Sequence, residues 1–378
     1  MPGTSVYVHV PFCATRCDYC AFATFTDRHD LRSQYVDGCI AHLERARADA
    51  GLAPPGDLSW PEPAPTLYLG GGTPSQLEIT DLARLLAAVP VAEGSEVTVE
   101  ANPEDVTGAF ARALVEAGVN RVSLGVQSLD PVVLSGLGRR HDPSAVAAAA
   151  EAIGEAGIGS YSVDLIYGGA GESDRSFVAT LEGVLGLEPA PAHVSAYALT
   201  VEPGTPLWRD RSRHPDDDAQ ARRYELADEL LTAAGLSWYE ISNWARPGHE
   251  SRHNLNYWAQ GDYLAIGSAA HGHRAGRRWW NVRTPERYLA ALAAGRSPVA
   301  GEETLDPPLR ASEALELALR TRQGVPRDCL PPEFGEREEL ARLVEPVPGP
   351  EGAGRVRLTL AGRLLANEVA CRLVSKIT

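Results

Sequence analysis

Three closely spaced cysteines near the start of the chain are the residues best suited to chemistry. Cys13, Cys17 and Cys20 follow the spacing C-x3-C-x2-C in one short loop, after an apolar alternating segment at 6–10. Three thiolates on one loop can hold three irons of a cubane iron–sulfur cluster, whereas ordinary ferredoxin clusters take four cysteines. The fourth iron would then stay open to a small molecule.

A zinc site is the alternative for these cysteines. Structural zinc usually takes four Cys or His ligands, and His9 is the nearest candidate for the fourth. Because His9 belongs to the apolar segment before the loop and not to the loop itself, the spacing favours the iron–sulfur cluster over zinc.

The segments that must position this loop alternate between strand and helix patterns. Strands are predicted at 6–10, 66–69, 96–100, 121–126, 161–166 and 193–197, and helices at 31–50, 80–89, 107–117, 144–156 and 173–187. Six such units predict a parallel sheet. The pattern stops near residue 200, two units short of a closed eight-stranded barrel. We therefore expect an α/β fold with an open (β/α)6 partial TIM barrel, with reactive groups at the carboxyl ends of its strands. Residues 51–65 are rich in proline, which predicts a surface loop.

Glycines and polar residues fall where predicted strands end. Three glycines in the segment 70–74 would let backbone amides approach a ligand, although a plain turn also explains them. Glu100, Gln127 and Asp164 end the next three strands; they could line one rim as acceptors for an amine and ribose hydroxyls, or only cap helices. Arg139 could pair with a carboxylate or lie on the surface.

Together these motifs resemble the oxygen-independent coproporphyrinogen III oxidase family of the radical S-adenosylmethionine (SAM) superfamily. The matching stretches are Y-V-H-V-P-F-C, G-G-G-T-P, E-A-N-P-E, S-L-G-V-Q-S, G-L-G-R-R-H and D-L-I-Y-G, in consistent order over residues 7–168. The resemblance implies that Cys13, Cys17 and Cys20 bind a [4Fe–4S] cluster whose open iron takes SAM. It also implies SAM contacts from Tyr7, Tyr19, Gly71, Gly72, Thr73, Glu100, Gln127, Arg139 and Asp164.

Two branches of this family differ after the third cysteine. The oxidase has a fourth cysteine two residues later, where Phe22 stands here, and a long segment before the motif, for which we expect no room. The heme-chaperone branch has the motif C-x-Y-C-x-F, which residues 17–22 resemble. It also carries H-N-x-x-Y-W, which matches His253, Asn254, Tyr257 and Trp258. That resemblance implies heme as a further ligand, with an imidazole on iron and aromatic rings against the macrocycle. Core packing, with His253 bonded to the backbone, is the alternative.

We therefore expect a heme-trafficking protein that binds a SAM-coordinated cluster and one heme, and passes the heme to an acceptor protein. An electron donor such as a flavodoxin or ferredoxin is implied as a second partner, and no catalytic residue is assigned. Two other functions stay open: decarboxylation of coproporphyrinogen III to protoporphyrinogen IX, and radical chemistry on another substrate.

One segment of this sequence departs from the family pattern, because the family usually follows D-L-I-Y-G with Leu-Pro-Gly. Here the next residues, 169–171, read Gly-Ala-Gly, which predicts a looser turn near Asp164.

Composition and length limit the remaining possibilities. The chain has 378 residues, 44% of them hydrophobic and 22% charged, as in ordinary globular proteins, and its net charge of −15 argues against nucleic-acid binding. Without a signal segment or a long apolar run, we expect a cytoplasmic protein that does not span a membrane.

We predict a radical SAM partial barrel at 1–205, a linker and heme or substrate region at 206–300, and a smaller α+β domain at 301–378 ending in a winged-helix-like tail. Past residue 275, helices are predicted at 285–294, 308–322, 338–343 and 361–374, and a strand at 355–359.

Overall fold

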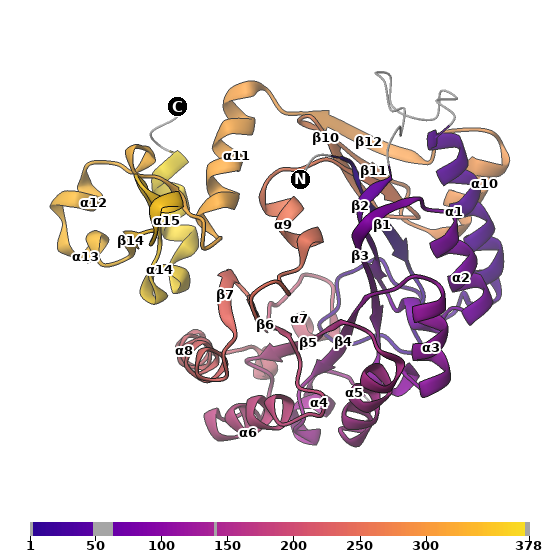
Figure 1. Ribbon diagram of the computed structural model, residues 1–378, viewed down its shortest axis with the longest axis horizontal. Coiled ribbons are helices and arrows are strands. Elements are labelled where there is room, and N and C mark those ends of the chain that lie inside the picture. The colour runs from indigo at the N-terminus through magenta and orange to yellow at the C-terminus, as the bar shows by residue number, and fades with distance from the viewer. Residues whose placement is uncertain (1–2, 48–62, 140–141, 375–378) are drawn as a thin grey trace.

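The computed structural model describes residues 3–47, 63–139 and 142–374. Most of the predicted loop at 51–65, and the end of the predicted first helix at 48–50, lie outside these residues. The fold consists of one large mixed sheet flanked by helices and a small second sheet near the C-terminus (Figure 1).

Six parallel strands in chain order form the centre of the large sheet. They are β1 (Ser5–Val10), β2 (Ala64–Gly71), β3 (Val91–Ala101), β4 (Arg121–Gln127), β5 (Ser160–Tyr167) and β6 (His193–Ala198). Between them run α1 (Arg32–Arg47), α2 (Ile79–Ala87), α3 (Gly108–Glu116), α4 (Pro131–Gly136), α5 (Ser144–Ala156) and α6 (Asp174–Leu185), with the short turns η1 (His29–Leu31), η2 (Pro74–Gln76) and η3 (Pro103–Asp105). The prediction of an α/β fold with an open (β/α)6 partial barrel is confirmed.

The pattern of burial along the strands separates the core from the inner face of the barrel. In β1, the side chains of Val6, Val8 and Val10 are completely buried in the large hydrophobic core that the helices cover. Each buried valine contributes on the order of 1.5–3 kcal/mol to stability. Tyr7 and His9 alternate with these valines, and Tyr7 stacks on Tyr68 of β2. The inner face is therefore polar and aromatic.

The large sheet continues on both sides of the six central strands, which the sequence did not predict. β7 (Ser237–Glu240) and β8 (Asn243–Ala245) follow β6, and on the other side β9 (Tyr263–Ile266) pairs parallel with β1 and leads to β10 (His271–Arg274), β11 (Arg277–Asn281) and β12 (Val299–Thr304). The described part of the 206–300 segment therefore supplies strands to both edges. The division into 1–205, 206–300 and 301–378 stays a prediction.

Four helices and a short turn connect these outer strands: α7 (Pro206–Arg209), η4 (Arg211–Arg213), α8 (Asp217–Ala233), α9 (Arg252–Trp258) and α10 (Pro285–Ala293). Helix α9 lies against the inner face, because the backbone N–H groups of Arg252 and His253 both donate to the carboxylate of Glu96 on β3 at 2.9 Å. This helix carries the predicted heme residues.

The C-terminal part has a sheet and a hydrophobic core of its own. Helix α11 (Pro307–Leu319) leads to a sheet of order β13 (Val325–Pro326), β15 (Arg355–Leu358), β14 (Val344–Pro346), which packs with η5 (Arg327–Cys329), α12 (Glu333–Glu336), α13 (Glu338–Ala341), η6 (Pro350–Gly352), α14 (Leu360–Leu364) and α15 (Ala366–Val374). The prediction of one last helix at 361–374 was wrong. Two helices, α14 and α15, occupy this segment. Helix α14 ends where the N–H of Leu365 donates to the carbonyl of Gly362, and the carbonyl of Leu365 accepts a hydrogen bond at the start of α15. Among the described helices, none has the length and apolar content of a membrane span.

Candidate cluster and cofactor site

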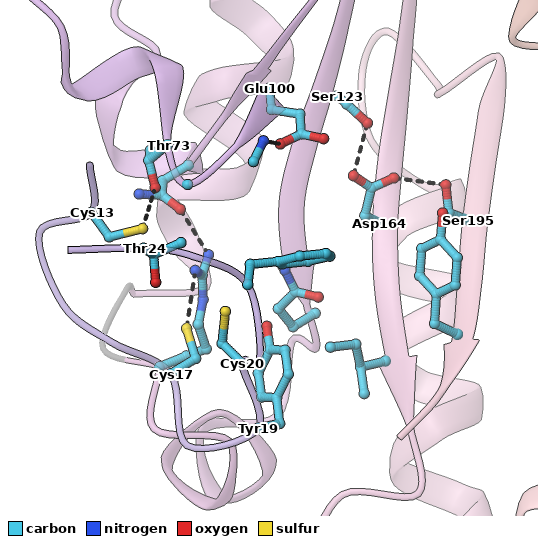
Figure 2. A pocket seen from close by; sticks show the side chains of 18 of the residues that line it. Cys13, Cys17, Tyr19, Cys20, Thr24, Thr73, Glu100, Ser123, Asp164 and Ser195 are labelled. Carbon is cyan, nitrogen blue, oxygen red and sulfur yellow. Dashed lines mark hydrogen bonds between the residues drawn. The ribbon is translucent and has the colours of Figure 1, made fainter. Parts of the chain in front are cut away.

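A cavity of about 740 Å³, here called the first cavity, opens at the carboxyl ends of the central strands and joins them to the cysteine loop. Figure 2 shows Cys13, Cys17 and Cys20 on one side and Glu100 and Asp164 across from them. The structure places eight of the nine predicted SAM residues around this cavity: Tyr19, Gly71, Gly72, Thr73, Glu100, Gln127, Arg139 and Asp164. Parallel strands bring these side chains together because their carboxyl ends meet at one edge.

Backbone hydrogen bonds close the cysteine loop. The N–H of Cys13 donates to the carbonyl of Phe25 at 3.1 Å, and the N–H of Phe25 donates to the carbonyl of Pro11 at 2.7 Å. Inside the loop, the N–H of Cys20 donates to the carbonyl of Cys17 at 3.2 Å. All three cysteines are free thiols. The loop is therefore tied to the end of β1, which fixes where the sulfurs lie.

Donors from two other turns reach the sulfurs. The hydroxyl of Thr73 donates to Cys13 Sγ at 3.5 Å, and Arg139 Nη1 donates to Cys17 Sγ at 3.7 Å. Burial raises the pKa of Cys13 to about 11 and also raises the pKa of Cys20. These two thiols therefore ionise readily only beside a bound cation.

The donor set fits an iron–sulfur cubane. Among the described residues, no three His, Cys, Asp or Glu side chains converge on a single metal ion. A cubane places no such demand, because each thiolate binds a different iron. Three free thiols that face one cavity, with hydrogen-bond donors to two of them, match a cluster that keeps one iron open.

The turn after β2 depends on its glycines. Gly71 has φ +109°, and a Cβ there would lie 2.2 Å from His9 Nδ1. A Cβ on Gly72 would lie 2.7 Å from the carbonyl oxygen of Val10, to which the Gly72 N–H donates at 2.8 Å. The glycines therefore let this turn pack closely against β1 at the edge of the cavity, where their amides donate to Glu100 and to the carbonyl of Val10.

Glu100 is a buried carboxylate with two fixed donors. Its Oε2 accepts from the N–H of Gly71 at 3.0 Å, and its Oε1 accepts from the hydroxyl of Tyr68 at 2.8 Å. Burial nevertheless raises the pKa of Glu100 to about 7. An ammonium group bound nearby would favour the ionised form, so Glu100 suits the amino group of an amino acid.

Asp164 is held by three hydroxyl groups. Its carboxylate accepts from Ser123 and from Ser195, each at 2.7 Å (Figure 2), and from Ser162 at 3.0 Å. With its orientation fixed by neighbouring strands, this acceptor can receive ribose hydroxyls without first being ordered.

The turn after β5, where the missing proline predicts a looser structure, is tied to a buried carboxylate. The N–H of Gly168 donates to Glu172 Oε2 at 2.6 Å, and Arg223 pairs with the same carboxylate at 3.3 Å. Both charged side chains are buried, so this ion pair holds the turn in place without the proline.

Arg139 and Gln127 complete the rim. Arg139 is not a free surface residue, because its Nη2 donates to the carbonyl of Gly125 at 2.6 Å and to Asn102 Oδ1 at 3.1 Å. Gln127 has φ +64°, where the register between β4 and β5 shifts. A non-glycine residue in this conformation costs on the order of 1–3 kcal/mol and is typical of functional sites.

Several residues of the lining were missed by the sequence analysis: Tyr68, Asn102, Arg121, Ser123, His193 and Ser195. Arg121 is the most unusual, since it is 4% exposed and its Nε and Nη1 lack a hydrogen-bond partner among the described residues. The nearest carboxylate, that of Glu96, lies 3.9 Å away. The alternation of side chains along a strand could have identified Arg121 and Ser123. Both precede Gln127 by an even number of residues on one strand, which places all three on the same face.

Tyr7 is the predicted SAM residue that lies elsewhere. It lines a second cavity of about 580 Å³, bounded by β1, the end of the cysteine loop, β10, β11 and α11. Its hydroxyl contacts His9 Nδ1 at 3.1 Å. Ala21 and Phe22 line both cavities, so the two spaces share the end of the cysteine loop as a wall.

The predicted heme residues lie on α9, which contributes side chains to both cavities. His253 is fully buried, and its ring nitrogens bond to the hydroxyls of Thr66 and Tyr257, each at 2.7 Å. Asn254 lines the first cavity and Tyr257 the second. The indole of Trp258 hydrogen-bonds Glu240. Because both nitrogens of His253 are engaged by side chains, an axial role for this residue would require breaking one of these bonds.

Comparisons with known proteins agree with this geometry. The Radical SAM superfamily model matches residues 7–184. A protein of Mycobacterium tuberculosis (strain H37Rv) named heme chaperone HemW is 45% identical, with 99% of this chain and 96% of that protein covered. The Bacillus subtilis protein of the same name is 32% identical, with 97% of each covered. A solved structure of Escherichia coli coproporphyrinogen III oxidase, HemN, has TM-score 0.81 at 21% identity, covering 99% of this chain and 90% of that one.

An open parallel barrel with three cysteines at its mouth, glycines after the second strand and acidic residues on the rim defines a radical SAM protein. Membership of this superfamily implies a [4Fe–4S] cluster and SAM as cofactors. Within it, the chain belongs to the heme chaperone HemW family, as the similarity over its whole length shows.

Proposed function

We propose that this protein is a heme chaperone, which binds a [4Fe–4S] cluster with exchangeable SAM, binds one heme and passes the heme to an acceptor protein. The observation that carries the proposal is similarity over the whole chain to proteins named heme chaperone HemW. Phe22 supports it, because this side chain is 68% exposed at the position where the oxidase branch has a further cysteine.

The first cavity supplies the residues that would hold the cofactors. Cys13, Cys17 and Cys20 would bind the cluster, which with SAM supplies one-electron chemistry when bound. Glu100 would accept the amino group, since its oxygens are fixed by backbone and tyrosine donors. Asp164 would accept ribose hydroxyls. Gly71, Gly72, Thr73, Tyr19, Gln127, Arg139 and, from the neighbouring cavity, Tyr7 would complete the surroundings.

The partners follow from this activity. We propose a heme-acceptor protein and an electron donor such as a flavodoxin or ferredoxin, and a cytoplasmic location. The net charge of −15 speaks against nucleic acid as a partner. The parts 1–205, 206–300 and 301–378 would serve as the radical SAM barrel, the heme or substrate region and a docking domain.

The alternative is decarboxylation of coproporphyrinogen III. The retained residues of the first cavity favour it, because they would support radical chemistry as well as cofactor binding. One anaerobic experiment separates the two functions. Protein with a reconstituted cluster is titrated with hemin, then incubated with SAM, a reductant and coproporphyrinogen III.

We expect one hemin per chain, release of that heme to an apo-hemoprotein, and no decarboxylated porphyrinogen. Formation of protoporphyrinogen IX with consumption of SAM would establish the oxidase instead. Hemin uptake without saturation, or heme that never reaches the acceptor, would contradict the chaperone.

A further inference from the structure

The second cavity has the size and the lining of a site for a flat organic ligand. Its volume of about 580 Å³ falls within the range of small-molecule sites. Apolar and aromatic side chains dominate its walls: Phe22 from the cysteine loop, Tyr257 from α9, Tyr263 from β9, Leu317 from α11 and Leu305 just before that helix.

Three histidines line this cavity, and hydrogen bonding distinguishes them. His9 bonds through Nδ1 to the hydroxyl of Tyr7 and through Nε2 to the carbonyl of Ala23, each at 3.1 Å. His273 bonds to the Gly261 carbonyl at 3.0 Å and accepts from the N–H of Gly276 at 3.1 Å. Neither ring has a nitrogen left for a ligand.

His271 is different. It is exposed, its ring stacks on Trp280 with centroids 6.0 Å apart, and within the described residues no hydrogen bond or ion pair engages its imidazole. Partial burial lowers the pKa of His271, which keeps the imidazole neutral at neutral pH. A neutral imidazole with free nitrogens, oriented by an aromatic ring and facing a cavity, is a ready metal ligand.

Two arginines line the same cavity. Arg278 is tied to Glu303 and Glu313, each at 2.9 Å. The guanidinium of Arg283 is exposed and forms no ion pair or hydrogen bond within the described residues. It is therefore available to a ligand carboxylate, which arginine can hold through two parallel hydrogen bonds.

Backbone strain marks the cavity independently of these side chains. Gln260 has φ +50° and Ala269 has φ +57°, and both line it. Each costs on the order of 1–3 kcal/mol, and such residues gather at ligand sites. The strained residue of the first cavity, Gln127, is a parallel case.

We propose, on the basis of the chaperone function above, that the second cavity is the heme site, with His271 as axial ligand and Arg283 as partner of a propionate. The macrocycle packs against Phe22, Tyr257 and Tyr263, and the heme lies beside the cluster loop because Ala21 and Phe22 border both cavities. In this arrangement Tyr257 of the H-N-x-x-Y-W segment forms part of the wall of the site, and His253 holds Tyr257 in place and does not bind the iron.

The test uses the full chain with its reconstituted cluster. Wild type, His271→Ala, Arg283→Ala and the control His249→Ala are titrated with hemin and, separately, with iron-free protoporphyrin IX. His249 is a suitable control because it is partly exposed, bonds to Ser160 and lines neither cavity. Absorption and electron-resonance spectra report the ligands of the iron, and thermal unfolding reports integrity of the fold.

We expect His271→Ala to weaken hemin binding about tenfold and to remove the histidine ligand signature, with recovery on added imidazole and unchanged protoporphyrin binding. Arg283→Ala should weaken both ligands by about three- to tenfold, since it acts on the propionate. His249→Ala should match the wild type.

Hemin bound with wild-type affinity and an unchanged histidine ligand signature by both His271→Ala and Arg283→Ala would overturn this placement while leaving the chaperone function intact. Absence of saturable hemin binding in the wild type would instead refute the chaperone function itself. Loss of the signature only in a His253→Ala variant that remains folded would assign the iron to α9 and also overturn the placement.

Discussion

Hydrogen bonding decides which single side chains of the inner face can take a ligand. Asp164 receives three hydroxyl donors, which orient the carboxylate and leave it open to the first cavity. His253 is fixed through both ring nitrogens, so its contribution is to hold Tyr257 and Thr66 in place. His271 makes no such bond within the described chain. Residue type alone does not separate these two histidines.

A buried carboxyl group outside the ligand sites gives a pH-dependent prediction. Burial raises the pKa of Glu240 from its ordinary value of 4.5 to about 7, although the Ser242 N–H and the Trp258 indole donate to it. Between these pH values the folded state holds a proton that the unfolded chain releases. The free energy of unfolding should therefore fall as pH rises through this range. In the Glu240→Gln variant, the free energy of unfolding should decrease over this pH range by on the order of 2 kcal/mol less than in the wild type.

The measurement is urea unfolding at about pH 5 and pH 8. Burial also raises the pKa of Glu100 and Glu172 to about 7, so part of the pH dependence should survive in the variant. The exposed Glu225 on α8 offers a matched control, and Glu225→Gln should behave as the wild type. Equal pH dependence in wild type and Glu240→Gln would contradict the assignment.

Local spacing made some of these residues predictable and others not. The cysteine triad and Asp164 could be found because their partners lie within one loop or at successive strand ends. Arg121 was missed although strand alternation was a signal for it. His271 could not be found, because its place beside the second cavity depends on strands that pair across the whole chain. The hydrogen bond between Thr66 and His253 joins residues 187 positions apart, and no local pattern reports it.

At the scale of elements, the turn after β2 should tolerate the least change. Gly72→Ala would place a methyl group 2.7 Å from the Val10 carbonyl oxygen and 2.8 Å from that of Phe12, both backbone atoms that cannot move aside. We expect a loss of about 2–4 kcal/mol in the free energy of unfolding. SAM binding should weaken at least about tenfold, because this turn borders the cofactor cavity.

Gly159 provides the comparison for this prediction. It precedes β5, and a Cβ there would meet no atom within 4 Å. Gly159→Ala should therefore leave both stability and SAM affinity near wild type. Urea unfolding and anaerobic equilibrium dialysis with SAM measure the two effects. A Gly72→Ala protein that is as stable and as tight-binding as Gly159→Ala would show that the turn can relax.

The order of the strands explains why the elements were only partly predictable. The six central units were evident from their alternating patterns, since each strand pairs with the next in sequence. Strand β9 instead pairs with β1, so that Tyr263 lies beside Ser5. Such pairing depends on contacts between distant segments. In addition, β9 has only four residues, which is too short for its hydrophobic periodicity to be recognised in the sequence. The second cavity exists because of this pairing and was therefore invisible in the sequence.

At the scale of the whole molecule, a partly buried ion pair joins the C-terminal part to the barrel. Arg363 on α14 donates through both Nη atoms to the two oxygens of Asp228 on α8, each at 2.8 Å. Its guanidinium also lies over the ring of Trp238 at 4.6 Å, and Asp228 accepts from the Trp244 indole. Figure 1 shows the C-terminal elements beside α11 and above α8 and β7.

Removal of this ion pair should loosen the C-terminal part without disturbing the cofactor cavity. Arg363→Ala leaves the partly buried Asp228 without its cation, which costs about 1–3 kcal/mol. Residues 301–378 should become sensitive to protease while SAM affinity stays at the wild-type level. Arg372→Ala is the matched control, because that arginine pairs with Glu368 and Glu333 inside the C-terminal part and in more exposed positions, worth about 1 kcal/mol or less. If limited proteolysis cut both variants equally slowly, the ion pair would not be what holds the C-terminal part, and the contacts of α11 with the barrel would have to do so.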